Sequence, residues 1–144
     1  MTITRLQVEA VLTKRLGALL DEAEMTAGAG GNPHMIDPIA WALRALGYGT
    51  SSLADLTDVD LETVAAAHVD PLLDLAELRT LESIASNLTS VDVTIGPVQE
   101  RKGMLADRVA KLVLDKRKGV QARWGHVLEQ PLEDTGGPVR LLAL

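Results

Sequence analysis

Apolar residues recur at helical spacing over most of this chain, with polar and charged residues between them. Over residues 4–24 an apolar residue returns every three or four positions, and Thr4 with Gln7 forms a capping-box pattern at the start. The stripe consists of Val8, Leu12, Leu16, Leu19 and Ala23. This stretch predicts a long helix with one apolar face.

Two Asp-Pro pairs, at 37–38 and 70–71, are typical of helix starts, because aspartate caps a first turn and proline fits the first helical position. They predict a short helix that Gly47 ends and a longer helix over 71–88. The longer helix is apolar on more than a narrow stripe, which indicates burial on several sides.

A capping pair at Thr57 and Asp60 predicts a helix over 57–68. A last helix is predicted from about residue 99 or 104 to residue 123, although two glycines weaken its pattern. The chain therefore has the pattern of four to five helices.

Three segments interrupt the helical pattern. Residues 26–36 contain three glycines and a proline, which predicts a flexible loop. Residues 90–97 are β-prone, because β-branched residues alternate at Val91, Val93 and Ile95 before Gly-Pro. Residues 130–144 contain two prolines and a Gly-Gly pair and cannot form one continuous helix.

These elements predict an all-α fold, a small bundle of about four to five helices with a β-prone loop near 90–97. Residues 1–129 would form a single helical domain, and residues 130–144 an extended C-terminal arm. The arm ends in four large aliphatic residues, Val139, Leu141, Leu142 and Leu144. Exposed aliphatic groups are unfavourable in water, so the arm is expected to dock on its own domain, on another subunit or on another protein.

Composition supports one aliphatic core. The 144 residues match a single domain, and 47% are hydrophobic although the chain has no Phe and only two Trp. There is no Cys, which excludes disulfides and thiol nucleophiles. The N-terminus lacks the apolar run of a signal peptide, and no run is long enough to span a membrane, so we expect synthesis in the cytoplasm and no membrane contact.

Charge is distributed unevenly along the chain. Residues 1–100 carry 15 acidic and 5 basic side chains, whereas residues 101–123 carry 8 basic and 2 acidic ones. Such asymmetry predicts complementary faces, either within one molecule or between neighbouring subunits. It leaves open whether the basic helix is simply solvated.

Catalytic, metal and cofactor motifs are not recognisable. His34, His68 and His126 are far apart and lack zinc-ligand spacing, and no serine lies in a nucleophile elbow. The glycine-rich loop follows a helix and carries no lysine, unlike a phosphate-binding loop. We therefore expect a protein that is not an enzyme and that has no cofactor and no metal.

Three consecutive segments carry a resemblance. The helix "DPLLDLAELRTLESIASNL", the loop "TSVDVTIGPVQERKG" and the basic helix "MLADRVAKLVLDKRKGVQARWG" follow one another after small helices opened by Asp-Pro. This order over about residues 53–124 resembles the head-to-tail adaptor (connector) proteins of tailed bacteriophages. No invariant motif is shared, and the long first helix with its glycine-rich loop makes the chain larger than the smallest adaptors.

The resemblance implies a structural subunit that docks under the portal protein, forms a ring that is commonly twelve-fold, and carries a downstream tail or stopper protein. The location would be the neck of the virion, and DNA would pass through the ring without sequence-specific binding. The residues expected at partner or subunit interfaces are Val91, Val93, Ile95, Arg101, Lys102, Lys116, Arg117, Lys118, Arg123, Val139, Leu141, Leu142 and Leu144.

A second function is compatible with the sequence. The basic segment 101–123 is predicted to be helical, so the chain could be a small nucleic-acid-associated regulatory or packaging protein. The acidic body and the scarcity of aromatic residues make sequence-specific reading of bases a poor fit.

Overall fold

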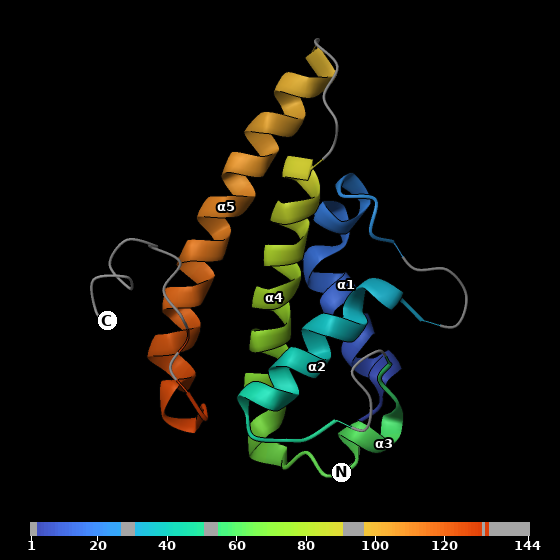
Figure 1. The fold of residues 1–144 in the computed structure, drawn as a ribbon, viewed down its shortest axis with the longest axis vertical. Coiled ribbons are helices and arrows are strands. Elements are labelled where there is room, and N and C mark those ends of the chain that lie inside the picture. Colours follow the sequence, from blue (N-terminus) through green and yellow to red (C-terminus); the bar gives the residue numbers. More distant parts are fainter. Residues whose placement is uncertain (1–2, 27–30, 51–54, 91–96, 131, 133–144) are drawn as a thin grey trace.

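The computed structural model describes residues 3–26, 31–50, 55–90, 97–130 and 132; within them, the side chains of 89–90 and 97–103 are not described. These residues form five α-helices and three short 3-10 turns and contain no strand, so the all-α prediction is confirmed (Figure 1). The helices are α1 (Arg5–Glu22), α2 (Ile36–Ala45), α3 (Asp58–Leu61), α4 (Val69–Ser90) and α5 (Pro97–Trp124).

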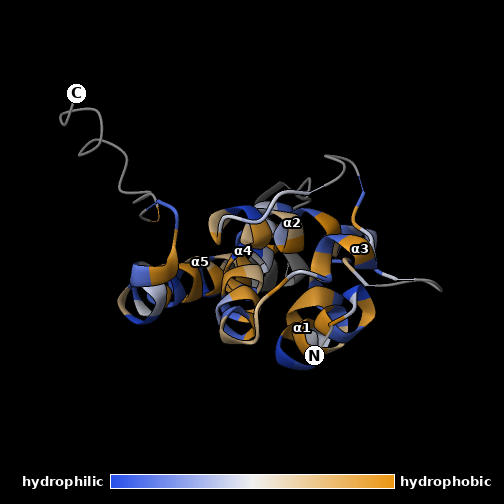
Figure 2. Ribbon diagram, turned by 90° about the horizontal axis from the view of Figure 1, so that it is seen from below, coloured by the Kyte–Doolittle hydropathy of each residue, from blue (hydrophilic) through white to orange (hydrophobic). Residues whose placement is uncertain are grey.

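Helix α4 lies at the centre of the bundle. It packs against α1, α2 and α5, and Figure 2 shows it between α5 on one side and α1 on the other. Its buried residues point in several directions, as the broad apolar pattern predicted, and they are Leu72, Leu75, Ala76, Leu78, Leu81, Ile84 and Leu88. One aliphatic cluster therefore connects helices from both halves of the chain.

One predicted end is confirmed in each of three helices. Thr4 caps α1 with the expected capping box, in which its side chain accepts from the backbone N–H of Gln7. After α2, Gly47 adopts a φ of +91°, a left-handed conformation that favours glycine at a helix end. Thr57 and Asp60 likewise form the expected capping box at the start of α3.

The start of α2 differs from the prediction. Asn32 accepts from the N–H of His34 and opens a 3-10 turn at Pro33–Met35, so the chain is already helical at Ile36. Asp37 therefore lies inside the first turn of α2 instead of capping it.

The prediction of one helix over 57–68 is wrong in its length. Helix α3 ends at Leu61, and Ala65 is extended with a ψ of 149°. The N–H of Ala65 donates to the hydroxyl oxygen of Tyr48 at 3.0 Å, so this donor is not available for a helical hydrogen bond. A separate 3-10 turn over Ala66–His68 then leads into α4.

The ends of the glycine-rich segment are tied together by buried polar groups. The N–H of Asn32 donates to the carboxylate of Glu9 at 2.7 Å, and its side-chain amide donates to the carbonyl of Met25 at 3.0 Å. Residues 27–30 of the predicted 26–36 loop lie outside the described residues. The described part of this segment is therefore attached to α1.

Helix α5 is longer than predicted. It begins at Pro97 and continues through both glycines, and its first turns extend past the end of α4 (Figure 1). The β-prone residues 91–96 and the arm residues 133–144 lie outside the described residues, so those two predictions remain predictions. Within the described ranges, the helices are too short or too polar to cross a lipid bilayer.

Candidate functional site

The basic residues of α5 that face α4 contact acidic residues of α4. Lys116 lies 3.2 Å from a carboxylate oxygen of Glu77 and 3.6 Å from one of Asp74. Arg15 on α1 contacts the same two carboxylates at 3.0 and 3.2 Å. This α1–α4–α5 charge cluster joins three helices by ion pairs.

Asp74 is the most enclosed member of this cluster. Its carboxylate accepts a 2.7 Å hydrogen bond from the indole N–H of Trp124, the last residue of α5. Burial raises the pKa of Asp74, but the Trp124 hydrogen bond and the positive charges of Lys116 and Arg15 outweigh burial and hold the pKa below its usual value. Asp74 is therefore charged at neutral pH and fixes the end of α5 against α4.

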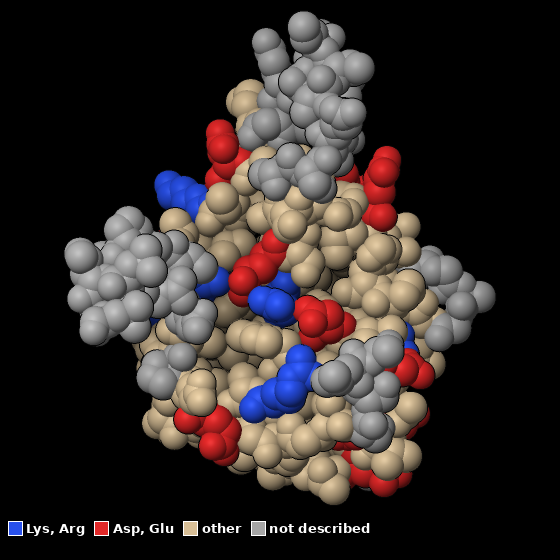
Figure 3. Space-filling view, viewed as in Figure 1, with Lys and Arg blue, Asp and Glu red and all other residues tan. Residues whose placement is uncertain are grey.

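A second group of ion pairs lies further along α4. Arg117 contacts Glu82 at 3.2 Å, and Arg79 contacts the same carboxylate at 3.7 Å. Arg79 also pairs with Asp37 on α2 at 3.1 Å, and its guanidinium lies 5.6 Å from the centre of the Trp41 ring. Figure 3 shows basic and acidic side chains next to one another near the middle of the molecule.

Three of the residues predicted at an interface thus have partners within the chain. Lys116 and Arg117 pair with α4, and Arg123 lies 3.6 Å from Asp74. The charge pattern predicted complementary faces either within one molecule or between neighbouring subunits. For these three residues the contact lies within one molecule. Lys118 is exposed and makes no ion pair with another described residue.

The contacts of the remaining predicted interface residues lie outside the part of the chain that the structure describes. Arg101 and Lys102 belong to α5, but their side chains are not described. The others lie outside the described residues and are Val91, Val93, Ile95, Val139, Leu141, Leu142 and Leu144.

The solvent face of α5 has a mixed charge. Apart from Arg123, which pairs with Asp74, the exposed basic residues among its described side chains are Arg108, Lys111 and Lys118. Two exposed carboxylates, Asp107 and Asp115, lie among them in the sequence. The net charge of these five side chains is +1, from three basic and two acidic groups. A phosphate backbone would therefore meet little uncompensated charge on this part of the helix.

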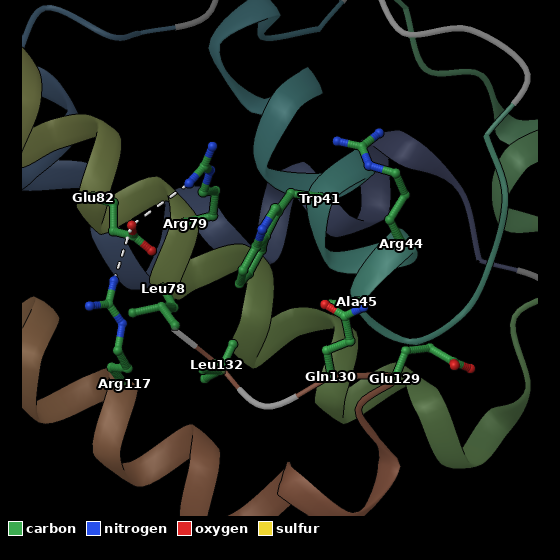
Figure 4. A pocket seen from close by; sticks show the side chains of 10 residues that line it. All are labelled: Trp41, Arg44, Ala45, Leu78, Arg79, Glu82, Arg117, Glu129, Gln130 and Leu132. Carbon is green, nitrogen blue, oxygen red and sulfur yellow. Dashed lines mark ion pairs between the residues drawn. The ribbon is translucent and has the colours of Figure 1, made fainter. Parts of the chain in front are cut away.

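A pocket of about 460 Å³ lies between α2, α4, α5 and the segment that follows α5 (Figure 4). Trp41 and Leu78 from the helices face Leu132 across it. The lining also includes Arg44, Ala45, Arg79, Glu82, Arg117, Glu129 and Gln130. The pocket combines an apolar floor with guanidinium and carboxylate groups.

The segment after α5 is fixed at this pocket by two hydrogen bonds. The N–H of Glu129 donates to the carbonyl of Ala45 at the end of α2, at 2.9 Å. The N–H of Leu132 donates to the side-chain carbonyl of Gln121 on α5, also at 2.9 Å. The chain therefore leaves the bundle at the rim of the pocket.

The ring of Trp41 is half-buried, packs on the core and lines the pocket. The pairing of Trp124 with Asp74 was not predicted from the sequence, because these residues are 50 positions apart and no local pattern connects them. The available signals were an indole at the end of the predicted last helix and a carboxylate between the leucines of the predicted helix over 71–88.

The described residues hold no cluster of His, Cys, Asp and Glu that could bind a metal ion. The two groups of ion pairs can stabilise the packing of α5, and the pocket can bind an apolar group that carries a negative charge. The chain matches no protein-family model, no curated protein and no solved structure.

Proposed function

We propose that this protein is a structural head-tail connector subunit of a tailed bacteriophage, which docks under the portal and forms a ring between capsid and tail. The observation that supports the proposal is the arrangement of α4 and α5. These long helices form an antiparallel pair, in which α4 ends and α5 begins at one end of the pair (Figure 1). Near the other end, Leu132, the last described residue, is hydrogen-bonded to Gln121 of α5.

This arrangement places the start of two candidate contact segments, residues 91–96 and 133–144, at opposite ends of one packed helix pair. The pair is held by the buried residues of α4, by Val109, Val113 and Val120 of α5, and by the ion pairs of Asp74 and Glu77. A subunit of a closed ring needs two different faces, one for each neighbour, as well as contacts above and below the ring. Segments at opposite ends of a packed helix pair suit that requirement.

The intramolecular ion pairs change which residues are expected to make the contacts. Because Lys116 and Arg117 already have carboxylate partners, moving them to a neighbouring subunit would break ion pairs within the chain. The loop 91–96, the arm and the exposed side of α5 are the better candidates for subunit and portal contacts. At the two edges of the buried face of α5, on either side of Val113, Leu112 and Leu114 are 39% and 46% exposed.

The proposal can be tested by co-expressing the chain with a portal protein encoded beside it and imaging the complexes by electron microscopy. We expect rings on the portal and a subunit that is monomeric or weakly associating alone. Removal of residues 131–144 should abolish capture by the portal, whereas Lys14→Glu, a charge change at an exposed residue of α1, should leave it intact. Full assembly of the truncated chain would contradict the role of the arm.

The nucleic-acid alternative predicts duplex binding that falls steeply as salt rises. The structure makes a sharper test possible, because Arg108, Lys111 and Lys118 are the exposed cations in the described part of α5 that make no ion pair with another described residue. Replacing all three by glutamine should abolish a gel shift if this function is correct. Under the connector proposal we expect no specific shift in the parent chain at physiological salt.

A further inference from the structure

The pocket beside Leu132 has an apolar floor and a charged rim. The rim includes the guanidinium groups of Arg44, Arg79 and Arg117. Glu82 partners two of them, but Arg44 is exposed and makes no ion pair with another described residue. The pocket therefore combines an apolar surface with an available positive charge.

We propose that in the free subunit this pocket binds the C-terminal segment of the same chain, residues 139–144. The aliphatic side chains of this segment would cover Trp41 and Leu78, and the terminal carboxylate would pair with Arg44. The inference goes beyond the proposed function, because it concerns the isolated chain and holds whatever partner the arm has in an assembly.

Connectivity is the first argument for this occupant. Leu132 lines the pocket and is fixed there by its hydrogen bond to Gln121, so the following segment starts at the pocket rim. Twelve residues follow it, which can extend to about 40 Å. The Gly136-Gly137 pair permits a reversal of direction before the last six residues. The end of the chain is therefore long enough to return.

Chemical complementarity is the second argument. The sequence Val-Arg-Leu-Leu-Ala-Leu at 139–144 supplies four large aliphatic side chains and ends in a carboxylate. Planar guanidinium groups form strong paired hydrogen bonds with carboxylates, and aliphatic groups pack on an indole face. A volume of about 460 Å³ lies in the range of pockets that enclose small ligands, so it can hold part of this segment.

The covalent connection between Leu132 and residues 139–144 favours binding of the chain's own segment over binding of the same segment from a second copy. A short flexible connection gives an effective concentration in the millimolar range. A second copy at micromolar concentration is thus at a disadvantage of about a thousandfold against the chain's own end. The apolar end of the arm would remain covered until a partner with higher affinity removes it.

The experiment uses the absence of cysteine from the chain, which makes Ala143→Cys a unique labelling site in the full-length protein. A bimane label on this cysteine loses its emission on contact with an indole. We expect emission several-fold lower than in the same labelled chain carrying Trp41→Phe, and independent of protein concentration from about 1 to 100 μM, because an intramolecular contact does not depend on concentration.

Changes in the arm and at the rim give independent readouts. Leu141→Asp with Leu142→Asp should restore the emission, because it removes two apolar groups from the segment. Arg44→Glu should raise the emission at least twofold by repelling the terminal carboxylate. Lys118→Glu is the matched control, with the same charge change on an exposed residue outside the pocket, and should leave the emission unchanged. Far-UV circular dichroism confirms the fold of each variant.

Three outcomes would overturn the inference. The first is a label as bright in the parent chain as in the Trp41→Phe variant. The second is quenching that rises with protein concentration, which assigns the pocket to the arm of another copy. The third is quenching that survives the double aspartate variant. If Trp41→Phe does not fold, the emission of the double aspartate variant still tests the inference, because Leu141 and Leu142 lie outside the described bundle.

Discussion

Replacing Asp74 by alanine should lower the free energy of unfolding by about 2–3 kcal/mol. The main loss is the hydrogen bond from Trp124, because a hydrogen bond to a charged acceptor contributes about 1.5–3 kcal/mol. The ion pairs add less. Lys116 and Arg15 each keep Glu77 as a partner, and the Arg123 side chain is 69% exposed, so its pair with Asp74 contributes almost nothing.

Urea unfolding followed by far-UV circular dichroism measures this change, with the slope of the transition checked for constancy between variants. Asp74→Asn keeps an acceptor for Trp124 but removes the charge, so it should fall between the parent chain and Asp74→Ala. Asp115→Ala is the matched control, because Asp115 is exposed on α5 and makes no ion pair with another described residue; it should change stability by less than about 0.5 kcal/mol.

The effect of Asp74 should depend on pH. Its pKa is depressed in the folded chain, so its contribution is complete above the unfolded-state pKa of about 3.9 and is lost as pH falls through the folded-state value. The stability difference between the parent chain and Asp74→Asn should therefore shrink below about pH 4. A difference within about 0.5 kcal/mol for Asp74→Ala at pH 7, or one that grows as pH falls, would refute this reasoning.

Three further changes test local features of the fold, each by thermal or urea unfolding. Gly119→Ala should stabilise the chain by about 0.5–1 kcal/mol, because Gly119 lies inside α5 and an added Cβ meets no atom within 4 Å; destabilisation would mean that this stretch is not helical in solution. Gly47→Ala should destabilise by about 1–2 kcal/mol, because its φ is +91° and a Cβ would lie 2.4 Å from an oxygen of Glu129 before that side chain moves; an unchanged midpoint would contradict the left-handed conformation. Thr4→Ala should cost about 1 kcal/mol by removing the side-chain cap of α1, and a neutral result would argue against the capping box with Gln7.

Sequence pattern predicted the helices whose ends have local signals. The capping box at Thr4 and the glycine at 47 depend on neighbouring residues alone, so both could be found without tertiary information. The end of α3 could not, because the donor that leaves the helix, the N–H of Ala65, bonds to Tyr48, which lies 17 residues earlier. Long-range partners of this kind override a local preference.

The charge pattern of the sequence predicted which segments are basic and which are acidic, but not which residues form ion pairs. It predicted that a basic segment and an acidic body have complementary faces, and Lys116 and Arg117 do meet carboxylates, on α4 of the same chain. The sequence could not distinguish this from contact between subunits, because the distance from α4 to α5 depends on how the helices pack. The pocket was likewise not predictable, since its lining comes from α2, α4, α5 and Leu132.

The anchoring of the chain after α5 has a mechanical consequence. The hydrogen bonds from Glu129 to Ala45 and from Leu132 to Gln121 attach this segment to two different helices. A pulling force applied to the C-terminal arm is therefore shared between α2 and α5 instead of peeling the last turn of α5 from its end. A subunit held by its arm could bear tension while its helices keep their packing.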